Sequence, residues 1–323
     1  MRKTNIKFLN SNLPDSFDYF ICSSSFEYRC LSAPRKLVKK SFKKVIIIEN
    51  KAASKKNEDN AQAIFNMYKG NSCICKIDYN DPLCIADFFY TNVKRSSSGH
   101  KSKILIDITS FTHETLMILL KILSIKKSQV EATLIYTNAL DYSPSNEVGH
   151  KWLSQGCKEV HSILGYPGVL FPSQKNRLIV VVGYEYNRVA DIVYALEPHN
   201  LTLVYGSPKH STTERNKEAN KYYSDFLQQM KFDFDQIDSE MIPCDNPDQT
   251  ATILSSLYLR YANENIMILP MNNKLSTIGV AKSIIQNEIV QACYAPAIVY
   301  NEEDYSLPGS ICYIYDGFNE TEL

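Results

Sequence analysis

Four polar stretches contain the residue types that suit ligand binding or acid–base chemistry, and each follows an apolar run. Hydroxyl groups suit phosphate or ribose oxygens, and the basic side chains among them supply a countercharge for an anion. The stretches therefore predict a site for a nucleotide-like anion. The residues are Ser23, Ser24, Ser25, Glu27 and Arg29; Asp107, Thr109, Ser110, Thr112 and His113; Gly183, Glu185 and Arg188; and Asn272, Asn273, Lys274, Ser276 and Thr277.

Helix capping is the alternative explanation for the hydroxyl groups. Thr109, Ser110 and Ser276 each precede an apolar helical pattern, and Ser and Thr commonly accept hydrogen bonds from the first N–H groups of a helix. Capping explains each residue taken singly. It explains less well why four such stretches follow strands, so ligand binding stays open for the set.

Catalysis has weaker support in the sequence. Asp107 ends an apolar run and suits a general base, with His113 nearby and Glu185 as a second acidic candidate. A carboxylate at such a position equally well accepts the hydrogen bonds that hold the next loop. The chain contains no G-x-S-x-G, no G-x-G-x-x-G and no Walker P-loop, so no hydrolase triad and no cofactor is predicted.

Short apolar runs mark the strands that would position these stretches. Val45–Ile48, Ile104–Ile108 and Leu178–Val182 are almost entirely apolar, which is typical of parallel strands buried on both faces. Helical patterns are expected over 27–40, 61–69, 82–93, 109–124, 187–196, 214–230, 247–262 and 276–285, with a short helix near 152–160. Further strands are expected over 17–22, 73–77, 130–136, 201–205, 237–242, 265–269 and 291–300, with edge strands near the N-terminus and at 312–315.

The alternation of strands and helices predicts an α/β fold with two consecutive Rossmann-like units and mainly parallel sheets. The first unit is expected over 1–145 and the second over 177–323, with a Gly-containing connector over 146–176. In such sheets ligands bind beyond the carboxyl ends of the strands, which is where all four polar stretches are expected.

An internal duplication is the simplest explanation of several local matches between the halves. Ser25–Arg29 matches Gly183–Arg188, and Asn80-Asp81-Pro82 matches Asn246-Pro247-Asp248, at an offset of about 160 residues. The alternative is that any two doubly wound units share this order of strands, turns and helices.

Composition and charge further limit the possible functions of the protein. Lys and Arg number 35, as do Asp and Glu, so the formal net charge is zero and gives no indication of nucleic-acid binding. The nine cysteines are odd in number and lie mostly in apolar runs, which is typical of reduced thiols, and no metal site is predicted. We expect no membrane span and a cytoplasmic protein.

The segment Ile106-Asp107-Ile108-Thr109-Ser110-Phe111-Thr112-His113-Glu114-Thr115-Leu116-Met117 resembles the strand-loop-helix signature of CARF-type domains, and the segment around Asn273–Thr277, within 268–282, is similar to it. CARF-type domains are Rossmann-like sensors of cyclic oligonucleotides in bacterial CRISPR-linked immunity. The present loop lacks the paired glycines of that family and has His113 at the position of a basic residue. The resemblance implies nucleotide sensing in bacterial antiviral defence. It also implies a protein partner that supplies the effector activity, because no nuclease module is recognisable.

We therefore expect a ligand-sensing or regulatory protein that binds a nucleotide-like anion at its strand ends. Two alternatives stay open. One is an enzyme that acts on a nucleotide or nucleoside through Asp107 or Glu185. The other is a partner-binding subunit without a small ligand. The chain has 21 tyrosines and 14 phenylalanines, and aromatic side chains are enriched in protein–protein interfaces.

Overall fold

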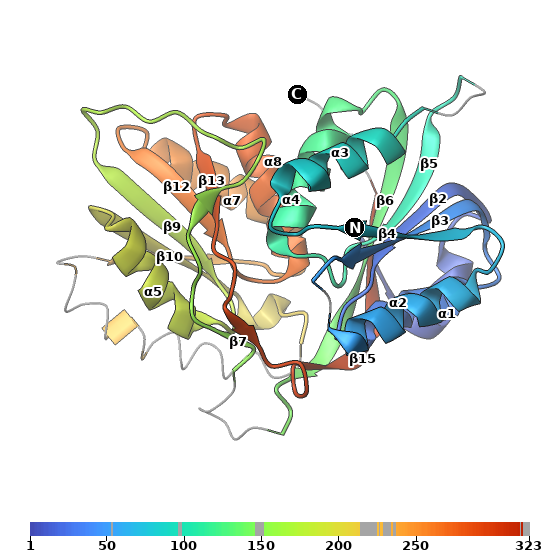
Figure 1. Ribbon diagram of the computed structural model, residues 1–323. Coiled ribbons are helices and arrows are strands. Elements are labelled where there is room, and N and C mark those ends of the chain that lie inside the picture. The colour runs from blue at the N-terminus through green and yellow to red at the C-terminus, as the bar shows by residue number, and fades with distance from the viewer. Residues whose placement is uncertain are drawn as a thin grey trace. The chain divides into compact units, whose positions relative to one another are not determined.

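Two mainly parallel β-sheets, each covered by helices, form the protein in its computed structural model (Figure 1). The predicted α/β fold with Rossmann-like units is confirmed. The structure describes residues 1–52, 54–95, 99–145, 152–213, 225, 227–228, 234, 237–316 and 318. The chain divides into two compact units, of which unit 1 is Met1–Asp141 with Ser306–Leu323 and unit 2 is Tyr142–Tyr305.

Unit 1 has a seven-stranded sheet in the order β1-β15-β6-β5-β2-β3-β4. The strands β2 to β6 are parallel, and β15 is antiparallel to β1. The strands are β1 (Arg2–Asn5), β2 (Ser16–Ser23), β3 (Ser41–Asn50), β4 (Ser72–Ile77), β5 (Ser102–Asp107), β6 (Val130–Tyr142) and β15 (Ser306–Asp316). The helices are α1 (Ser32–Leu37), α2 (Lys55–Met67), α3 (Pro82–Asn92) and α4 (His113–Ile125).

Helices cover both faces of the unit 1 sheet. Figure 1 shows α1 and α2 on one side and α3 and α4 on the other. On the first side, Leu37 and Ile64 pack with Phe20, Val45 and Ile47 in one buried cluster. The strands are apolar on both faces because both faces are covered, as the continuous apolar runs predict.

Unit 2 has a six-stranded sheet in the order β11-β10-β9-β12-β13-β8 and a separate two-stranded sheet of β7 and β14. Its strands are β7 (Ser154–Gln155), β8 (His161–Ser162), β9 (Asn176–Val182), β10 (Asn200–Gly206), β11 (Ile237–Ile242), β12 (Asn265–Pro270), β13 (Gln291–Tyr294) and β14 (Val299–Tyr300). Its helices are α5 (Tyr186–Leu196), α7 (Pro247–Arg260) and α8 (Lys274–Gln286).

The parallel parts of the two sheets have the same strand order. In chain order the strands of unit 1 are arranged third, second, first, fourth, fifth, as β4-β3-β2-β5-β6, and those of unit 2 as β11-β10-β9-β12-β13. The order reverses between β2 and β5 and between β9 and β12. Such a switch point opens a crevice at the carboxyl ends of the two strands, where open α/β sheets bind ligands.

Several predicted elements differ from the structure. The helix expected over 27–40 is a 3-10 turn, Tyr28–Leu31, followed by the short α1. The helix expected from Ala61 begins at Lys55, where a 3.0 Å ion pair between Lys55 and Asp59 joins successive turns. The helix expected over 109–124 begins only at His113, because residues 109–112 form the turn after β5.

The connector region is also different. The short helix expected near 152–160 is wrong: this part is extended and forms β7, which pairs with β14. Gly156 there has φ +66°, a left-handed conformation that interrupts a helix. The strand expected over 291–300 is split into β13 and β14, with Pro296 in the interruption.

The last strand belongs to unit 1. Residues 312–315 were expected as an edge strand of the second unit, whereas β15 lies between β1 and β6. Its pairing partners are distant in sequence, so no local pattern signals them. The helix expected over 214–230 falls largely outside the described residues. Within the described part of the chain, no helix has both the length and the apolar character that a bilayer crossing requires.

Candidate functional site

The first two predicted stretches meet at the switch point of unit 1. In the register of β2 and β5, Cys22 lies beside Asp107, so the loops that follow these strands begin side by side. The Ser110 hydroxyl donates a hydrogen bond to the Ser23 carbonyl oxygen at 2.8 Å. We call the polar loops at this point the unit 1 rim, made of residues 23–29 and 107–113.

The serines after β2 are buried and bonded to other parts of unit 1. Ser23 is 1% exposed and shares a 2.9 Å hydrogen bond with the Tyr79 hydroxyl. The Ser24 hydroxyl donates to Asn57 Oδ1 at 2.5 Å, and the Ser25 carbonyl accepts from Asn60 at 2.8 Å. These contacts fix the shape of the loop, and the serine side chains do not form its outer surface.

Asp107 holds the turn between β5 and α4. Its Oδ1 accepts hydrogen bonds from the Thr109 amide at 3.1 Å and from the Thr109 hydroxyl at 2.5 Å. The Thr109 hydroxyl in turn accepts from the Thr137 amide at 2.9 Å, which ties the turn to β6. Burial raises the pKa of Asp107 to about 6, against the opposing effect of the Thr109 hydrogen bonds. A carboxyl that is 2% exposed suits this positioning task better than proton transfer to a bound substrate.

The outer part of the unit 1 rim is the start of α4. Thr112 caps the helix by accepting a hydrogen bond from the Thr115 amide at 3.0 Å. Thr112, Ser110 and His113 are half-buried and so reach the surface of the rim. The first N–H groups of a helix lack intrahelical partners and carry the positive end of its dipole, so this position favours an anion.

The other two predicted stretches meet at the switch point of unit 2. Asn272 Nδ2 donates a 2.6 Å hydrogen bond to the Val182 carbonyl at the end of β9. The loops also approach closely at Gly183, where a Cβ atom would lie 2.4 Å from the Met271 carbonyl oxygen. We call residues 183–188 and 271–277 the unit 2 rim. A glycine is needed at position 183 for this close approach, whatever the ligand.

The start of α8 forms the outer part of the unit 2 rim. Asn273 caps the helix through a 2.8 Å hydrogen bond from the Ser276 amide. Ser276 and Thr277 are buried and donate to the Asn273 carbonyl at 2.8 and 3.0 Å, so both serve the cap rather than the surface. Asn272, Asn273 and Lys274 are half-buried and reach the surface.

A buried glutamate–arginine pair follows the first strand of unit 1. Arg29 is 3% exposed; its Nε lies 2.8 Å and its Nη2 2.6 Å from Glu27 Oε2. The Ser306 hydroxyl donates to the same carboxylate oxygen at 2.6 Å. Arg29 Nη1 also donates to the Thr137 carbonyl at 3.3 Å. We call Glu27, Arg29 and Ser306 the first Glu–Arg–Ser cluster.

Unit 2 also brings together a glutamate, an arginine and a serine, with different spacing and different guanidinium nitrogens. Arg188 is 5% exposed, and its Nη1 lies 3.2 Å from Glu185 Oε1 and 3.1 Å from the Ser154 hydroxyl. The Ser154 hydroxyl donates to Glu185, and Arg188 Nε donates to the Gly156 carbonyl at 3.0 Å. Burial lowers the pKa of Arg188, but Glu185, together with Tyr300, Tyr294 and Cys157, more than offsets burial, so the arginine pKa is raised. We call Glu185, Arg188 and Ser154 the second Glu–Arg–Ser cluster.

The two clusters change the interpretation of both arginines. Each guanidinium is bonded to a carboxylate and to backbone carbonyls of its own unit. This favours anchoring of the loop after the first strand over the predicted countercharge for a ligand. The sequence revealed the glutamates and arginines through their recurrence, but not Ser154 and Ser306, which come from segments far along the chain. Tyr79, Asn57 and Asn60 were missed for the same reason.

The structure is similar to that of a Type III CRISPR defence DNA nuclease activated by cyclic oligoadenylate, with a TM-score of 0.50 and 7% sequence identity over 82% of this chain and 63% of the nuclease. This chain thus spans less than two thirds of the nuclease. At this identity the likeness is one of fold.

The cytoplasmic domain of a prokaryotic cation chloride cotransporter aligns with a TM-score of 0.25 and 9% identity, over 90% of this chain and 98% of that domain, which is too low a score to carry an argument. No protein-family model matches the chain, and no curated protein matches it in sequence.

Proposed function

We propose that this protein senses a nucleotide-like anion in antiviral defence and passes the signal to a protein partner. The observation that carries the proposal is the pair of half-exposed strand-to-helix turns at the two switch points. One contains Ser110, Thr112 and His113, and the other contains Asn272, Asn273 and Lys274. The fold shared with a nuclease that cyclic oligoadenylate activates supports the same class of ligand.

The binding residues in this proposal are the outer residues of each rim. The first backbone N–H groups of α4 and α8 would donate to phosphate oxygens, while Ser110, Thr112 and Asn273 shape the turns through their own hydrogen bonds. Lys274, the first residue of α8, would add a full charge. The buried residues of the rims, including Asp107 and the two Glu–Arg–Ser clusters, would hold the loops in place.

Thermal unfolding in the presence of a nucleotide panel tests the proposal. The panel contains cyclic oligoadenylates, linear oligonucleotides, mononucleotides and inorganic phosphate. A ligand at a hundred times its Kd stabilises the folded state by about 2.7 kcal/mol, which corresponds to a rise in Tm of several degrees. An unchanged Tm with every compound, at concentrations well above micromolar, would contradict the proposal.

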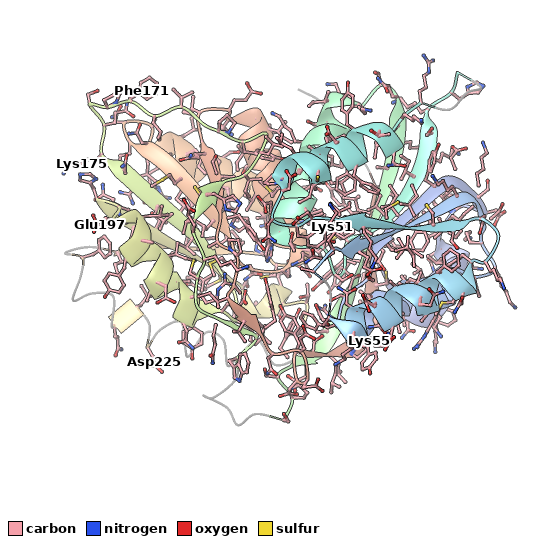
Figure 2. The ribbon with its side chains drawn as sticks, in the orientation of Figure 1. Lys51, Lys55, Phe171, Lys175, Glu197 and Asp225 are labelled. Carbon is pink, nitrogen blue, oxygen red and sulfur yellow. The ribbon has the colours of Figure 1, made fainter. Side chains whose placement is uncertain are left out.

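The residue that we expect to matter most for affinity is Lys274. Replacement by alanine removes a charge-assisted hydrogen bond worth about 1.5–3 kcal/mol, so binding should weaken roughly 10- to 100-fold. Lys175→Ala is the matched control, because Lys175 is exposed and directly precedes β9, at the opposite end of the same sheet (Figure 2). Equal affinities for the two variants would remove Lys274 from the site.

A further inference from the structure

The edge of the unit 1 sheet at β4 differs from the other edges of the two main sheets. Edge strands attract further strands, and proteins commonly protect them with charges, prolines or very short strands. In the described part of the chain, β1 carries Arg2 and Lys3, β8 has two residues, and β11 carries Asp238 and Glu240. In contrast, β4 is six residues long, mostly apolar and without proline. It therefore lacks the protection that the other three edges have.

The single charged residue of β4 is neutralised within its own unit. Lys76 Nζ lies 3.3 Å from Glu49 Oε1 and 3.9 Å from Glu58 Oε1. A lysine at a sheet edge keeps other strands away through its charge. Because two carboxylates already surround this ammonium group, it repels an approaching strand less than an unpaired lysine would.

Alternate residues of β4 direct their backbone groups away from β3. The Asn71 carbonyl accepts a hydrogen bond from the Val45 amide at 2.9 Å. The Ile77 carbonyl accepts one from the Lys51 amide at 2.8 Å. In a parallel pair only every second residue bonds to a given neighbour, so the odd-numbered residues of β4 face β3 and the even-numbered ones face outward. The outward residues, with which no described strand pairs, are Ser72, Ile74 and Lys76.

A groove beside β4 separates the strand from α3. It has a volume of about 340 Å³. Cys75 and Ile77 line it from the strand, and Cys84 and Phe88 line it from the helix. An added strand therefore has room for its side chains on this face of the sheet.

We propose that β4 pairs antiparallel with β4 of a second copy of this chain, about a two-fold axis at Ile74. This register uses every outward residue: Ile74 lies opposite the partner's Ile74, and Ser72 lies opposite the partner's Lys76. In each such pair the two residues exchange both of their backbone hydrogen bonds. The two-fold symmetry closes the assembly as a dimer, because each copy uses its only β4. The dimer does not depend on the proposed sensing function.

The charges around β4 are complementary in this arrangement. No like charges lie directly opposite each other, because Lys76 faces a serine. Antiparallel pairing also brings the start of one β4 beside the end of the other. The exposed Lys69 precedes the strand and Asp78 follows it, so each lysine approaches the partner's Asp78. The edge is thus complementary to itself, which favours a second copy as its occupant.

Sedimentation equilibrium of the full chain under reducing conditions tests the proposal. We expect the wild type to be a dimer at micromolar concentrations. Ile74→Lys and Ile74→Glu each place like charges together at the axis, so each should raise the Kd of the dimer at least about 100-fold. Thr4→Lys is the matched control and should leave the dimer intact, because Thr4 is also half-buried but lies on β1, the opposite edge of the same sheet.

An equimolar mixture of the two Ile74 variants should restore the dimer, since opposite charges then meet at the axis. Restoration also shows that both variants are folded. A monomeric wild type overturns the proposal, and so does a dimer that persists in both single variants. If the variants are folded by far-ultraviolet circular dichroism but their mixture stays monomeric, the axis does not lie at Ile74.

Amide hydrogen exchange of the wild type gives a readout that needs no variant. The outward amides of β4 should exchange more slowly as the protein concentration rises into the range of the dimer. Exchange over residues 72–77 that does not depend on protein concentration overturns the proposal.

Discussion

Asp107 shows how one buried carboxyl makes stability depend on pH. Its pKa is raised from 3.8 to about 6 by burial, so the folded state favours the protonated form. The folded chain then binds more protons than the unfolded chain between these two values. Stability from this group is fully present below about pH 4 and is lost as pH rises through about 6.

Comparison with Asp107→Asn isolates this effect. Asparagine retains an oxygen that accepts the Thr109 hydrogen bonds but has no proton to lose. The difference between 3.8 and about 6 corresponds to roughly 3 kcal/mol, so the wild type should lose about that much stability relative to the variant between about pH 4 and 7. Urea unfolding across this range measures it. Parallel curves for the two proteins would show that Asp107 does not titrate as described.

Arg29 should matter more to stability than an exposed arginine with a similar partner. Arg29→Met leaves the Glu27 carboxylate, 10% exposed, without a countercharge, and this should cost about 3–5 kcal/mol. Arg2→Met is the control: it breaks the Arg2–Asp316 pair, which is about half exposed, and should cost less than about 1 kcal/mol.

A double variant separates the buried charge from the lost packing. Adding Glu27→Gln to Arg29→Met removes the unpaired carboxylate, so the double variant should be more stable than the sum of the single effects implies. Chemical denaturation supplies the free energies of unfolding. Strict additivity would mean that Glu27 and Arg29 do not act as a pair.

At the scale of elements, the close packing of α7 on α8 depends on one glycine. A Cβ atom at Gly279 would lie 2.6 Å from Thr250 Cγ2 and 2.8 Å from the Pro247 carbonyl. Gly279→Ala should therefore destabilise unit 2 by about 1–3 kcal/mol, despite the better helix propensity of alanine.

Thr250→Ser provides the rescue for this variant. Serine lacks Cγ2 but keeps the hydroxyl that donates to the Pro243 carbonyl at 2.9 Å. The double variant should recover only part of the loss, since the contacts with Cβ of residue 250, at 2.7 Å, and with the Pro247 carbonyl remain. Thermal unfolding measures the recovery, and no gain over Gly279→Ala would show that Cγ2 of Thr250 does not contribute to the clash.

The elements that the sequence predicts well are strands that other elements cover on both faces. Strands such as β3, β5 and β9 are covered on both faces, so their continuous apolar runs identify them. The region 152–160 has no such run, and its strand β7 forms because it pairs with β14. The same difference holds for the two rims. Their loops follow strand ends and are therefore predictable, whereas Ser154, Ser306 and Tyr79 come from other segments and contact the rims only in the folded chain.

At the scale of the whole molecule, the equal strand order of the two sheets supports the duplication that the local matches predict. A Glu–Arg pair also follows the first parallel strand of each unit, whereas the serines that contact the pairs come from non-equivalent strands, β15 and β7. We propose that the units are copies of one ancestral unit, although unit 1 now completes its sheet with β1 and β15.

Unit 1 should not remain folded without β15. Removal of residues 306–323 exposes β6, whose side chains are mostly buried, and deletes Ser306 from the first Glu–Arg–Ser cluster. Limited proteolysis of the chain ending at Tyr305 should degrade unit 1 and leave a resistant fragment from unit 2. Survival of fragments from residues 1–141 would show that the remaining strands suffice.

The position of β15 also delays the completion of unit 1 during synthesis. Domains commonly fold as they leave the ribosome, N-terminal part first. Here the strand that lies beside β6 is translated only after all of unit 2, so unit 2 has every strand of its sheet before unit 1 does. Until then the nascent chain carries an open, apolar strand edge of the kind that chaperones protect. A polypeptide released early would retain that edge, which makes complete translation a condition for a soluble product.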